Sequence, residues 1–218
     1  MSKQFKSGLS KLPQIAVITG DIVNSQNSEQ GAEWLSALKE FLSIYGDSPK
    51  DWQIYRGDSF QLIVYQPQEA FRIALRLKAI VKRFKELDVR MAIGVGCLEH
   101  HAEQVLQSNG EAFVHSGRKF DSLKKQTLAV KTPWQEFDKA INLFIKLALL
   151  TIDDWSETSA EVVAASLEHP EATQKEISAL LSIPQSRVSE RLSRAGFDAI
   201  KDAEQYYREA ITKRIQGE

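Results

Sequence analysis

Residues 52–65 read WQIYRGDSFQLIVY, and they contain two apolar, strand-like runs on either side of a short turn. The runs at 52–55 and 59–65 are rich in β-branched and aromatic residues, which favour strands. Residues 56–58 (RGD) have the turn chemistry of a β-hairpin connection. This stretch therefore predicts an antiparallel pair of strands in the first half of the chain.

Strands and helices alternate on both sides of the hairpin. Residues 14–19 (QIAVIT) and 89–96 (VRMAIGVG) are short apolar runs that read as buried strands. Apolar residues at helical spacing occupy 29–45 and 68–88. The resulting order, β-α-β-β-α-β, is typical of the ferredoxin-like or split-βαβ arrangement, and it predicts an α+β fold.

The pattern changes at Pro133. A helix at 111–125 and a strand at 127–131 extend the first part, and only helical spacing follows. We therefore expect a mixed α+β domain followed by an all-α domain. The predicted division is a flexible N-terminal tail at 1–13, the α+β domain at 14–133, a connecting long helix at 134–154 and a helix-turn-helix domain at 155–218.

Residues 172–195 (ATQKEISALLSIPQSRVSERLSRA) predict two short helices joined by a tight turn. Thr173 and Glu176 form the Thr-x-x-Glu capping box that opens the first helix. Pro184 is suited to the first turn of the second helix, which buries Val188 and Leu192. This spacing is typical of a helix-turn-helix.

The outward residues of the second helix offer amide, hydroxyl and guanidinium groups, which bind base edges and phosphates of double-stranded DNA. Arg187, Arg191 and Arg194 lie three or four residues apart, so we expect them to share one outward face. The alternative is a helical hairpin with a solvated polar face that contacts a protein. The predicted DNA-binding residues are Gln185, Ser186, Arg187, Ser189, Arg191 and Arg194.

Two aspartates suggest a second site. Asp21 ends the first strand and Asp58 begins the third, and these strands are antiparallel neighbours in the usual 4-1-3-2 order of a split-βαβ sheet. The two carboxylates should then share a sheet edge, where they could hold Mg²⁺ and the phosphates of a nucleotide. Gly20 and Gly57 precede them and leave backbone room for a phosphate. The alternative is two loop aspartates favoured by turn chemistry.

The motifs TGDIVNS, YRGDSF, VRMAIGVG and GEAFVHSGRKF together resemble those of the palm-type domain of class III nucleotidyl cyclases. With the segment TQKEIS…IPQSRVSERL, residues 14–205 resemble the SatD family, bacterial proteins of poorly defined function. The resemblance implies that Asp21 and Asp58 are metal carboxylates for Mg²⁺ with a nucleotide. It also implies that Arg118 contacts a phosphate or the transition state.

The sequence departs from the cyclase pattern at two places. Cyclases carry an Asn one helical turn before the arginine, where this chain has Val114 or His115. Their adenine-reading Lys has no counterpart in residues 53–55 (QIY). Because phosphoryl transfer depends on positioned charge, these departures favour binding over catalysis, and no residue is assigned a catalytic role.

We therefore expect a DNA-binding regulator whose N-terminal domain binds a nucleotide or another partner. One alternative is a metal-dependent nucleotidyl cyclase or a related phosphoryl-transfer enzyme. The other is an adaptor that uses both domains for protein contacts.

Composition limits the other possibilities. The 218 residues are 43% hydrophobic and 26% charged, with a formal net charge of -1, so an expectation of DNA binding depends on the local helix alone. A single cysteine excludes an internal disulfide and fits a reducing cytoplasm. No apolar stretch reaches the length of a membrane span, so no membrane partner is expected.

The helix expected from Trp134 to Leu150 is too apolar for a solvated linker. Two-fold dimers commonly present paired recognition helices to DNA half-sites, so this helix predicts a homodimer. The alternative is that its apolar stripe packs against the sheet of its own chain. The stripe consists of Phe137, Ile141, Phe144, Ile145 and Leu149.

Overall fold

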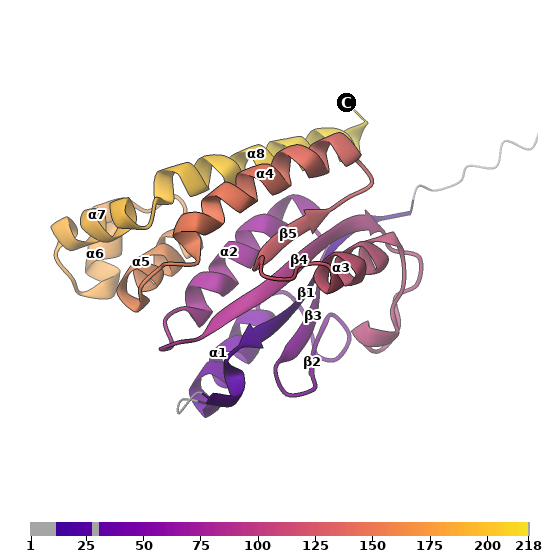
Figure 1. Cartoon of the computed structure of the whole chain (residues 1–218), viewed down its shortest axis with the longest axis horizontal. Helices are drawn as coiled ribbons and strands as arrows, with labels where there is room; N and C mark the ends of the chain where they lie inside the picture. Colours follow the sequence, from indigo (N-terminus) through magenta and orange to yellow (C-terminus); the bar gives the residue numbers. More distant parts are fainter. Residues whose placement is uncertain (1–11, 28–30, 218) are drawn as a thin grey trace, which may run out of the picture.

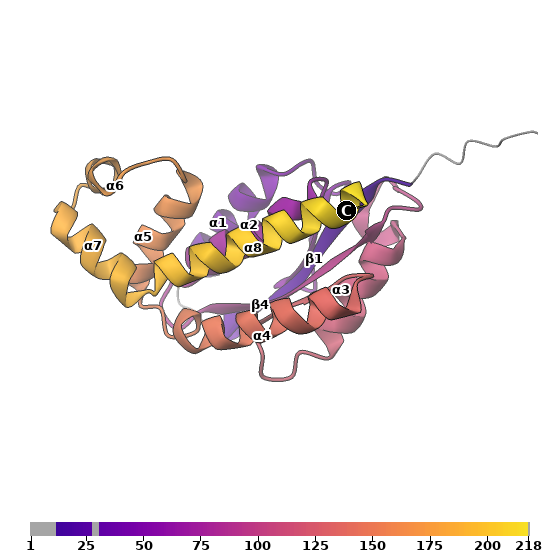
Figure 2. The ribbon, with the colours of Figure 1, turned by 90° about the horizontal axis from the view of Figure 1, so that it is seen from above.

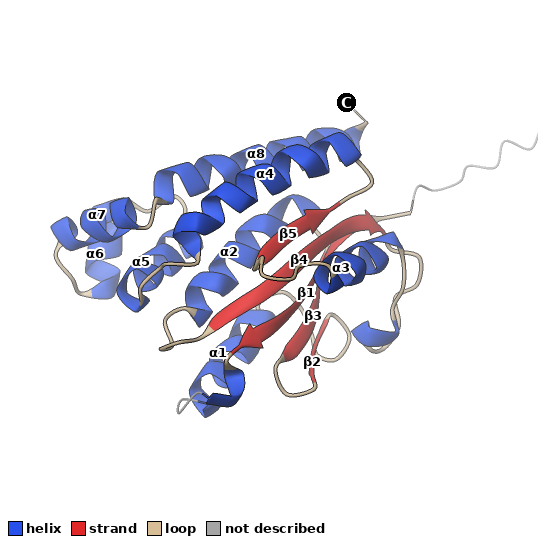
Figure 3. Cartoon of the chain, viewed as in Figure 1, coloured by secondary structure: helices blue, strands red, loops and turns tan. Residues whose placement is uncertain are grey.

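The computed structural model describes residues 12–27 and 31–217, so most of the predicted N-terminal tail lies outside the described residues. Its centre is a five-stranded mixed sheet with the order β2-β3-β1-β4-β5, in which only β4 and β5 are parallel (Figure 3). The order of the first four strands is the predicted one, and the predicted hairpin at 52–65 is present. The strands are β1 (Gln14–Val23), β2 (Trp52–Tyr55), β3 (Ser59–Val64), β4 (Asp88–Cys97) and β5 (Leu128–Lys131).

Helices cover both faces of the sheet. The alternation of strand side chains sends Ala16 and Ile18 to one apolar cluster, shared with α1 (Gly31–Ser43) and α2 (Ala70–Val81). Ile15 and Val17 point to the opposite face, which carries α3 (Glu111–Asp121) (Figures 1 and 2). Short 3-10 helices occupy Ser25–Asn27, Pro67–Glu69 and Val105–Gln107.

The remaining helices follow β5. Two long ones, α4 (Gln135–Ile152) and α8 (Phe197–Gln216), pack against each other. Three shorter helices between them gather at one end of the molecule (Figures 1 and 2). These are α5 (Glu157–Glu168), α6 (Gln174–Leu181) and α7 (Gln185–Arg194).

Several predicted boundaries are wrong. β1 does not stop at residue 19 but continues to Val23, because it is hydrogen-bonded along its length to β4. The helix predicted to reach residue 88 ends at Val81, and Glu86 in the following turn has a left-handed φ of 62°. The third helix likewise ends at Asp121.

Helix α4 closes the open edge of the sheet. The Asn142 side chain accepts a hydrogen bond from the Val130 N–H (2.9 Å) and donates one to the Val130 carbonyl (2.8 Å). An unpaired edge strand is a template for pairing with other chains, and these bonds occupy part of that edge. α4 is therefore packed onto the sheet of its own chain along one side.

Most of the apolar stripe of α4 packs inside its own chain, which is the alternative to the predicted homodimer contact. Phe137, Ile141, Ile145 and Leu149 are buried in the same cluster as the sheet residues. Phe144 is 42% exposed. Since this cluster includes residues from both predicted domains, the α+β part and the helical part share one apolar core.

A fully buried lysine connects α2 to the end of α4. The Lys78 Nζ lies 2.8 Å from carboxylate oxygens of both Asp88 and Asp153, and it donates to Thr127 Oγ1 at 3.0 Å. Lys82 adds a hydrogen bond to the Asp153 carbonyl at 2.6 Å. We call these five residues the Lys78 cluster. It joins α2, the start of β4 and the C-terminal end of α4.

Tyr207 fixes α8 against the first part of the chain. Its side chain is fully buried between the rings of Phe71 and Phe137, and its hydroxyl donates to the Pro67 carbonyl at 3.0 Å. Burial raises the pKa of Tyr207, so the phenol stays protonated. Next to it, Arg208 forms an ion pair with Glu69.

Candidate functional site

Asp21 lies in β1 between β3 and β4, and its carboxylate is held by an arginine. Arg90, its register partner on β4, donates from Nε to Asp21 Oδ1 at 3.0 Å and from Nη2 to Oδ2 at 2.5 Å. These hydrogen bonds raise the pKa of the Arg90 guanidinium, which also lies over the ring of Phe120 in α3. The Asp21 charge is therefore paired within the protein.

Asp58 is placed at the same end of the sheet. The Ile22 N–H donates to the Asp58 carbonyl at 3.1 Å, so Asp58 lies beside β1 close to Asp21, although it stands in the turn just before β3 and not on the strand as predicted. The Asp58 carboxylate accepts a hydrogen bond from the Ser25 hydroxyl at 2.6 Å. Each carboxylate thus has its own protein partner, and a shared metal ion would compete with Arg90 for Asp21. Within the described residues, no three or more His, Cys, Asp or Glu side chains form a metal-binding group.

Polar side chains extend from Asp21 across the sheet face that carries α3. Gln61 donates to Thr19 Oγ1 at 3.3 Å, and Thr19 donates to Ser116 Oγ on α3 at 3.0 Å. Partial burial raises the pKa of Tyr55 above its ordinary value, with a smaller contribution from Asp21. Tyr55 therefore remains protonated, as a hydroxyl donor, at neutral pH.

The two glycines of the predicted phosphate site differ. A Cβ at Gly20 would overlap the Phe60 ring and the Arg90 carbonyl, so the space beside this glycine is filled by its own chain. The prediction that Gly20 leaves room for a phosphate is wrong on that side of the strand. Gly57 lies in the hairpin turn with a φ of 94° and open space around it.

Arg118 does not join this group. It is exposed on α3, and no hydrogen bond from it to another described residue is found, whereas Ser116 on the same helix is buried against Thr19. Residues two apart on a helix do not share a face, so Arg118 points away from the sheet. The cation at Asp21 is Arg90 instead. The sequence signal for it was a single arginine within the apolar strand VRMAIGVG, placed opposite Asp21 by the strand order.

The second candidate site is the hairpin of α6 and α7. Thr173 and Glu176 form the predicted capping box, with the Glu176 carboxylate accepting from the Thr173 N–H at 2.7 Å. Ser182 closes α6 in a left-handed conformation, and the Ser178 hydroxyl donates to the Ile183 carbonyl at 2.6 Å. The turn between the two helices is therefore held by hydrogen bonds.

Most of the predicted outward residues of α7 are exposed, but one arginine is not. Arg191 is 20% exposed and pairs with Glu161 on α5 at 3.1 Å, so the prediction that all three arginines face outward is wrong for Arg191. Arg187 and Arg194, each 63% exposed, both pair with Glu190, at 2.9 and 2.7 Å. The exposed residues of this face are Gln185, Ser186, Arg187, Ser189, Glu190 and Arg194.

These features define an α+β protein with a five-stranded mixed sheet. No helix in the part of the chain that the structure describes has both the length and the apolar content to cross a membrane. The chain belongs to the SatD family, whose family model matches residues 14–209. A search of curated proteins found no match.

Proposed function

We propose that this member of the SatD family is a cytoplasmic DNA-binding regulator, with α6 and α7 as its helix-turn-helix and α7 as the recognition helix. The observation that carries the proposal is the exposed start of α7. Gln185, Ser186, Arg187 and Ser189 all face solvent there, while Val188 and Leu192 hold the helix to the core. Amide, hydroxyl and guanidinium groups at the start of a recognition helix are the groups that read base edges.

Glu190 sets the strength of the proposed contact. Its single carboxylate pairs with both Arg187 and Arg194, so a DNA phosphate that binds either arginine must compete with it. The formal net charge of -1 adds no general attraction to DNA. We therefore expect modest affinity for a mixed-sequence duplex, with a dependence on salt that comes from these two arginines.

The test is the salt dependence of duplex binding. In the variant Arg187→Gln/Arg194→Gln, the slope of log affinity against log salt should fall by about two, because each lost phosphate contact removes about one. Glu190→Gln should bind several-fold more tightly, because it frees both arginines. Both variants are measured by fluorescence anisotropy on a labelled duplex.

The control is Lys139→Gln/Lys213→Gln, which removes the same charge from exposed positions on α4 and α8. It should keep the slope of the unmodified protein. If the arginine variant and this control have equal slopes, α7 is not the DNA-binding helix.

We propose further that the palm-like α+β part binds a nucleoside triphosphate with Mg²⁺ at Asp21 and Asp58. Support comes from the open space around Gly57 and from the position of Asp58 in the hairpin turn, where its carbonyl is bonded to β1 next to Asp21. The Arg90 pair and the departures from the cyclase motifs favour binding over turnover. The runner-up function, a nucleotidyl cyclase or related enzyme, requires Asp21 to leave Arg90.

A melting experiment tests this site. Mg²⁺ with one of the four triphosphates should raise the melting temperature by mass action, and Asp58→Asn should abolish the rise. Asp47→Asn is the control at another acidic loop position, and it should keep the rise. If none of the four triphosphates with Mg²⁺ changes the melting temperature, Asp21 and Asp58 have only a structural role. Steady release of pyrophosphate from a triphosphate, lost in Asp58→Asn, would instead favour the nucleotidyl cyclase or a related enzyme.

We also propose a homodimer through the outer face of α4. Leu143, Leu147 and Leu150 are 56%, 57% and 74% exposed, and they lie beside an apolar groove of about 510 Å³ between α4 and α8. Exposed leucines next to an apolar groove are self-complementary, because the leucines of each copy can fill the groove of the other. The occupant is therefore a second copy of this chain.

Light scattering at micromolar concentration should give the mass of a dimer, and Leu147→Glu/Leu150→Glu should give a monomer with an unchanged circular dichroism spectrum. Ile44→Glu replaces an apolar side chain that is equally exposed at the end of α1, and it should remain dimeric. A monomeric unmodified protein would contradict the dimer.

A further inference from the structure

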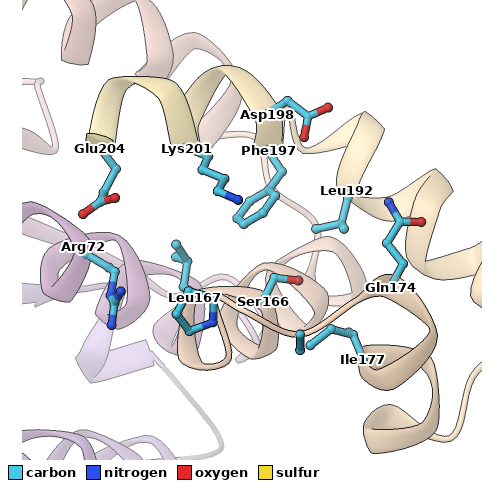
Figure 4. A pocket seen from close by; sticks show the side chains of 12 residues that line it. Arg72, Ser166, Leu167, Gln174, Ile177, Leu192, Phe197, Asp198, Lys201 and Glu204 are labelled. Atoms are coloured by element: carbon cyan, nitrogen blue, oxygen red, sulfur yellow. The ribbon is translucent and has the colours of Figure 1, made fainter. Parts of the chain in front are cut away.

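The inner side of α7 is incompletely packed near its C-terminal end. A partly open pocket of about 160 Å³ borders Leu192 of α7, and Ile177 of α6 lines the same pocket (Figure 4). Apolar contacts fix the position of a helix closely only where side chains interlock without gaps. The polar contacts of this end of α7 are therefore important for where the helix lies.

The C-terminal end of α7 is held by an indole. The Trp155 Nε1–H donates to the Ala195 carbonyl at 3.0 Å, and the two residues are 5% and 1% exposed. Ala195 is the C-cap of α7, and the last carbonyls of a helix have no partner within it. A buried carbonyl needs a donor from elsewhere, and the indole supplies it.

Trp155 is itself a rigid donor, because the residues before it belong to the Lys78 cluster. Lys82 donates to the Asp153 carbonyl at 2.6 Å, and the Trp155 N–H donates to the Ile152 carbonyl at 3.2 Å. A donor on a fixed support holds its acceptor more precisely than a donor on a mobile loop. The position of Trp155 therefore determines where α7 ends.

An ion pair restrains the rotation of α7 about its own axis. The Arg191 Nη1 lies 3.1 Å from the Glu161 Oε2 on α5, and these side chains are 20% and 41% exposed. An ion pair of this exposure contributes little to stability, but it directs the guanidinium toward α5. The contacts at Ala195 and Arg191 together restrain both the translation and the rotation of α7.

We propose that Trp155 and Glu161 are positioning residues of the recognition helix. They fix α7 so that Gln185 and Arg187 meet base edges in one register, and they touch no DNA themselves. Their loss should reduce sequence selectivity rather than general affinity, because phosphate attraction is independent of sequence, whereas base readout needs hydrogen bonds of defined geometry. This consequence rests on the proposed DNA-binding function, whereas the restraint of α7 does not.

The probe for selectivity is a duplex selected by the full chain from a randomised library. The readout is the ratio of its affinity to that of a scrambled duplex of equal length. Trp155→Phe keeps an aromatic ring but removes the donor, and it should lower this ratio about 10-fold, the value of one good base contact. Glu161→Gln should lower it about 3-fold. Affinity for the scrambled duplex and its salt slope should stay unchanged in both variants.

Two controls make the same chemical changes elsewhere. Trp52→Phe removes an indole donor from the Gly46 carbonyl, which it binds at 2.9 Å, and Glu168→Gln removes the carboxylate that pairs with Arg76 at 3.1 Å. Both controls should keep the ratio of the unmodified protein. If they lower it as much as the test variants do, a general loss of stability explains the effect and the positioning role is wrong.

Arg191→Gln separates positioning from DNA contact. The spacing of the arginines on α7 predicts a phosphate contact for Arg191, and losing such a contact would reduce the salt slope by about one. Positioning through Glu161 predicts a lower ratio with an unchanged slope. A fall in the slope would assign Arg191 to DNA and overturn the role of Glu161.

Amide hydrogen exchange tests the restraint without DNA. In Trp155→Phe, exchange in the last turn of α7 should increase about 10-fold, with no change in α6. Glu161→Gln alters a partly exposed side chain, so it keeps the test available if Trp155→Phe fails to fold. Unchanged exchange in α7 would overturn the proposal.

The two kinds of measurement distinguish this proposal from the DNA-binding function. Faster exchange in α7 of a protein that selects no duplex sequence would support the restraint of α7 and contradict the function. A selective protein whose Trp155→Phe and Glu161→Gln variants keep the full ratio would support the function and overturn the positioning role.

Discussion

Lys78→Met is expected to lower the free energy of unfolding by about 3 kcal/mol, because it leaves the carboxylates of Asp88 and Asp153 without their shared cation. The lysine is completely buried, whereas the two carboxylate side chains are 19% and 36% exposed. That partial exposure, together with Lys82, keeps the loss at the low end of the range for a broken buried ion pair. In a protein of this size the melting temperature should fall by about 6–12 °C.

A double-mutant cycle identifies the cause. Lys78→Met/Asp153→Asn should lose less stability than the sum of the two single variants, because the second change removes a carboxylate that the first left unpaired. Lys39→Met, an exposed position on α1, is the control and should change stability by less than about 0.5 kcal/mol. If the free energy of unfolding of Lys78→Met were within about 1 kcal/mol of that of the unmodified protein, the Lys78 cluster would not be a major source of stability.

Tyr207→Ala is expected to cost about 4 kcal/mol, because it opens a cavity between Phe71 and Phe137 and removes the hydrogen bond to the Pro67 carbonyl. Tyr207→Phe keeps the ring and should cost only about 1–2 kcal/mol, mostly for the unpaired carbonyl. Urea unfolding measures both values. Amide exchange in Tyr207→Ala should increase along α8 first, since the ring packs this helix against Phe71 and Phe137.

The neighbouring tyrosine provides the control. Tyr206 is the same residue type on the same helix, but it is 40% exposed, and its ring lies beside those of Phe137 and Phe144. Tyr206→Ala should cost about 1 kcal/mol. If the two alanine variants were equally stable, the burial of Tyr207 would not explain how α8 is held.

The sheet could be predicted well because its strands are local, apolar and bounded by turn residues. The hairpin at 52–65 and the 4-1-3-2 order followed from such patterns. The length of β1 did not follow from such patterns, because Gly20 and Asp21 were typical of a turn that ends a strand. Their extended backbone depends on Phe60 and Arg90, which are distant in sequence. Long-range pairing of this kind overrides local preference.

The candidate sites show the same limit. The capping box of α6 was predictable because both partners lie within four residues of each other. The ion pair of Arg191 with Glu161 was not, because the spacing of residues on α7 says nothing about a carboxylate 30 residues away.

The placement of α5, α6 and α7 between two long helices has a mechanical consequence. A module joined by a single linker can swing freely about one hinge. The part formed by α5, α6 and α7 is instead attached through two helices. The Lys78 cluster anchors the end of α4, and Tyr207 anchors α8. Any displacement of the hairpin must then move α4 along β5 and α8 along α2 and α4 at the same time. A signal passing between the two parts would accordingly travel as a small shear rather than as a wide rotation.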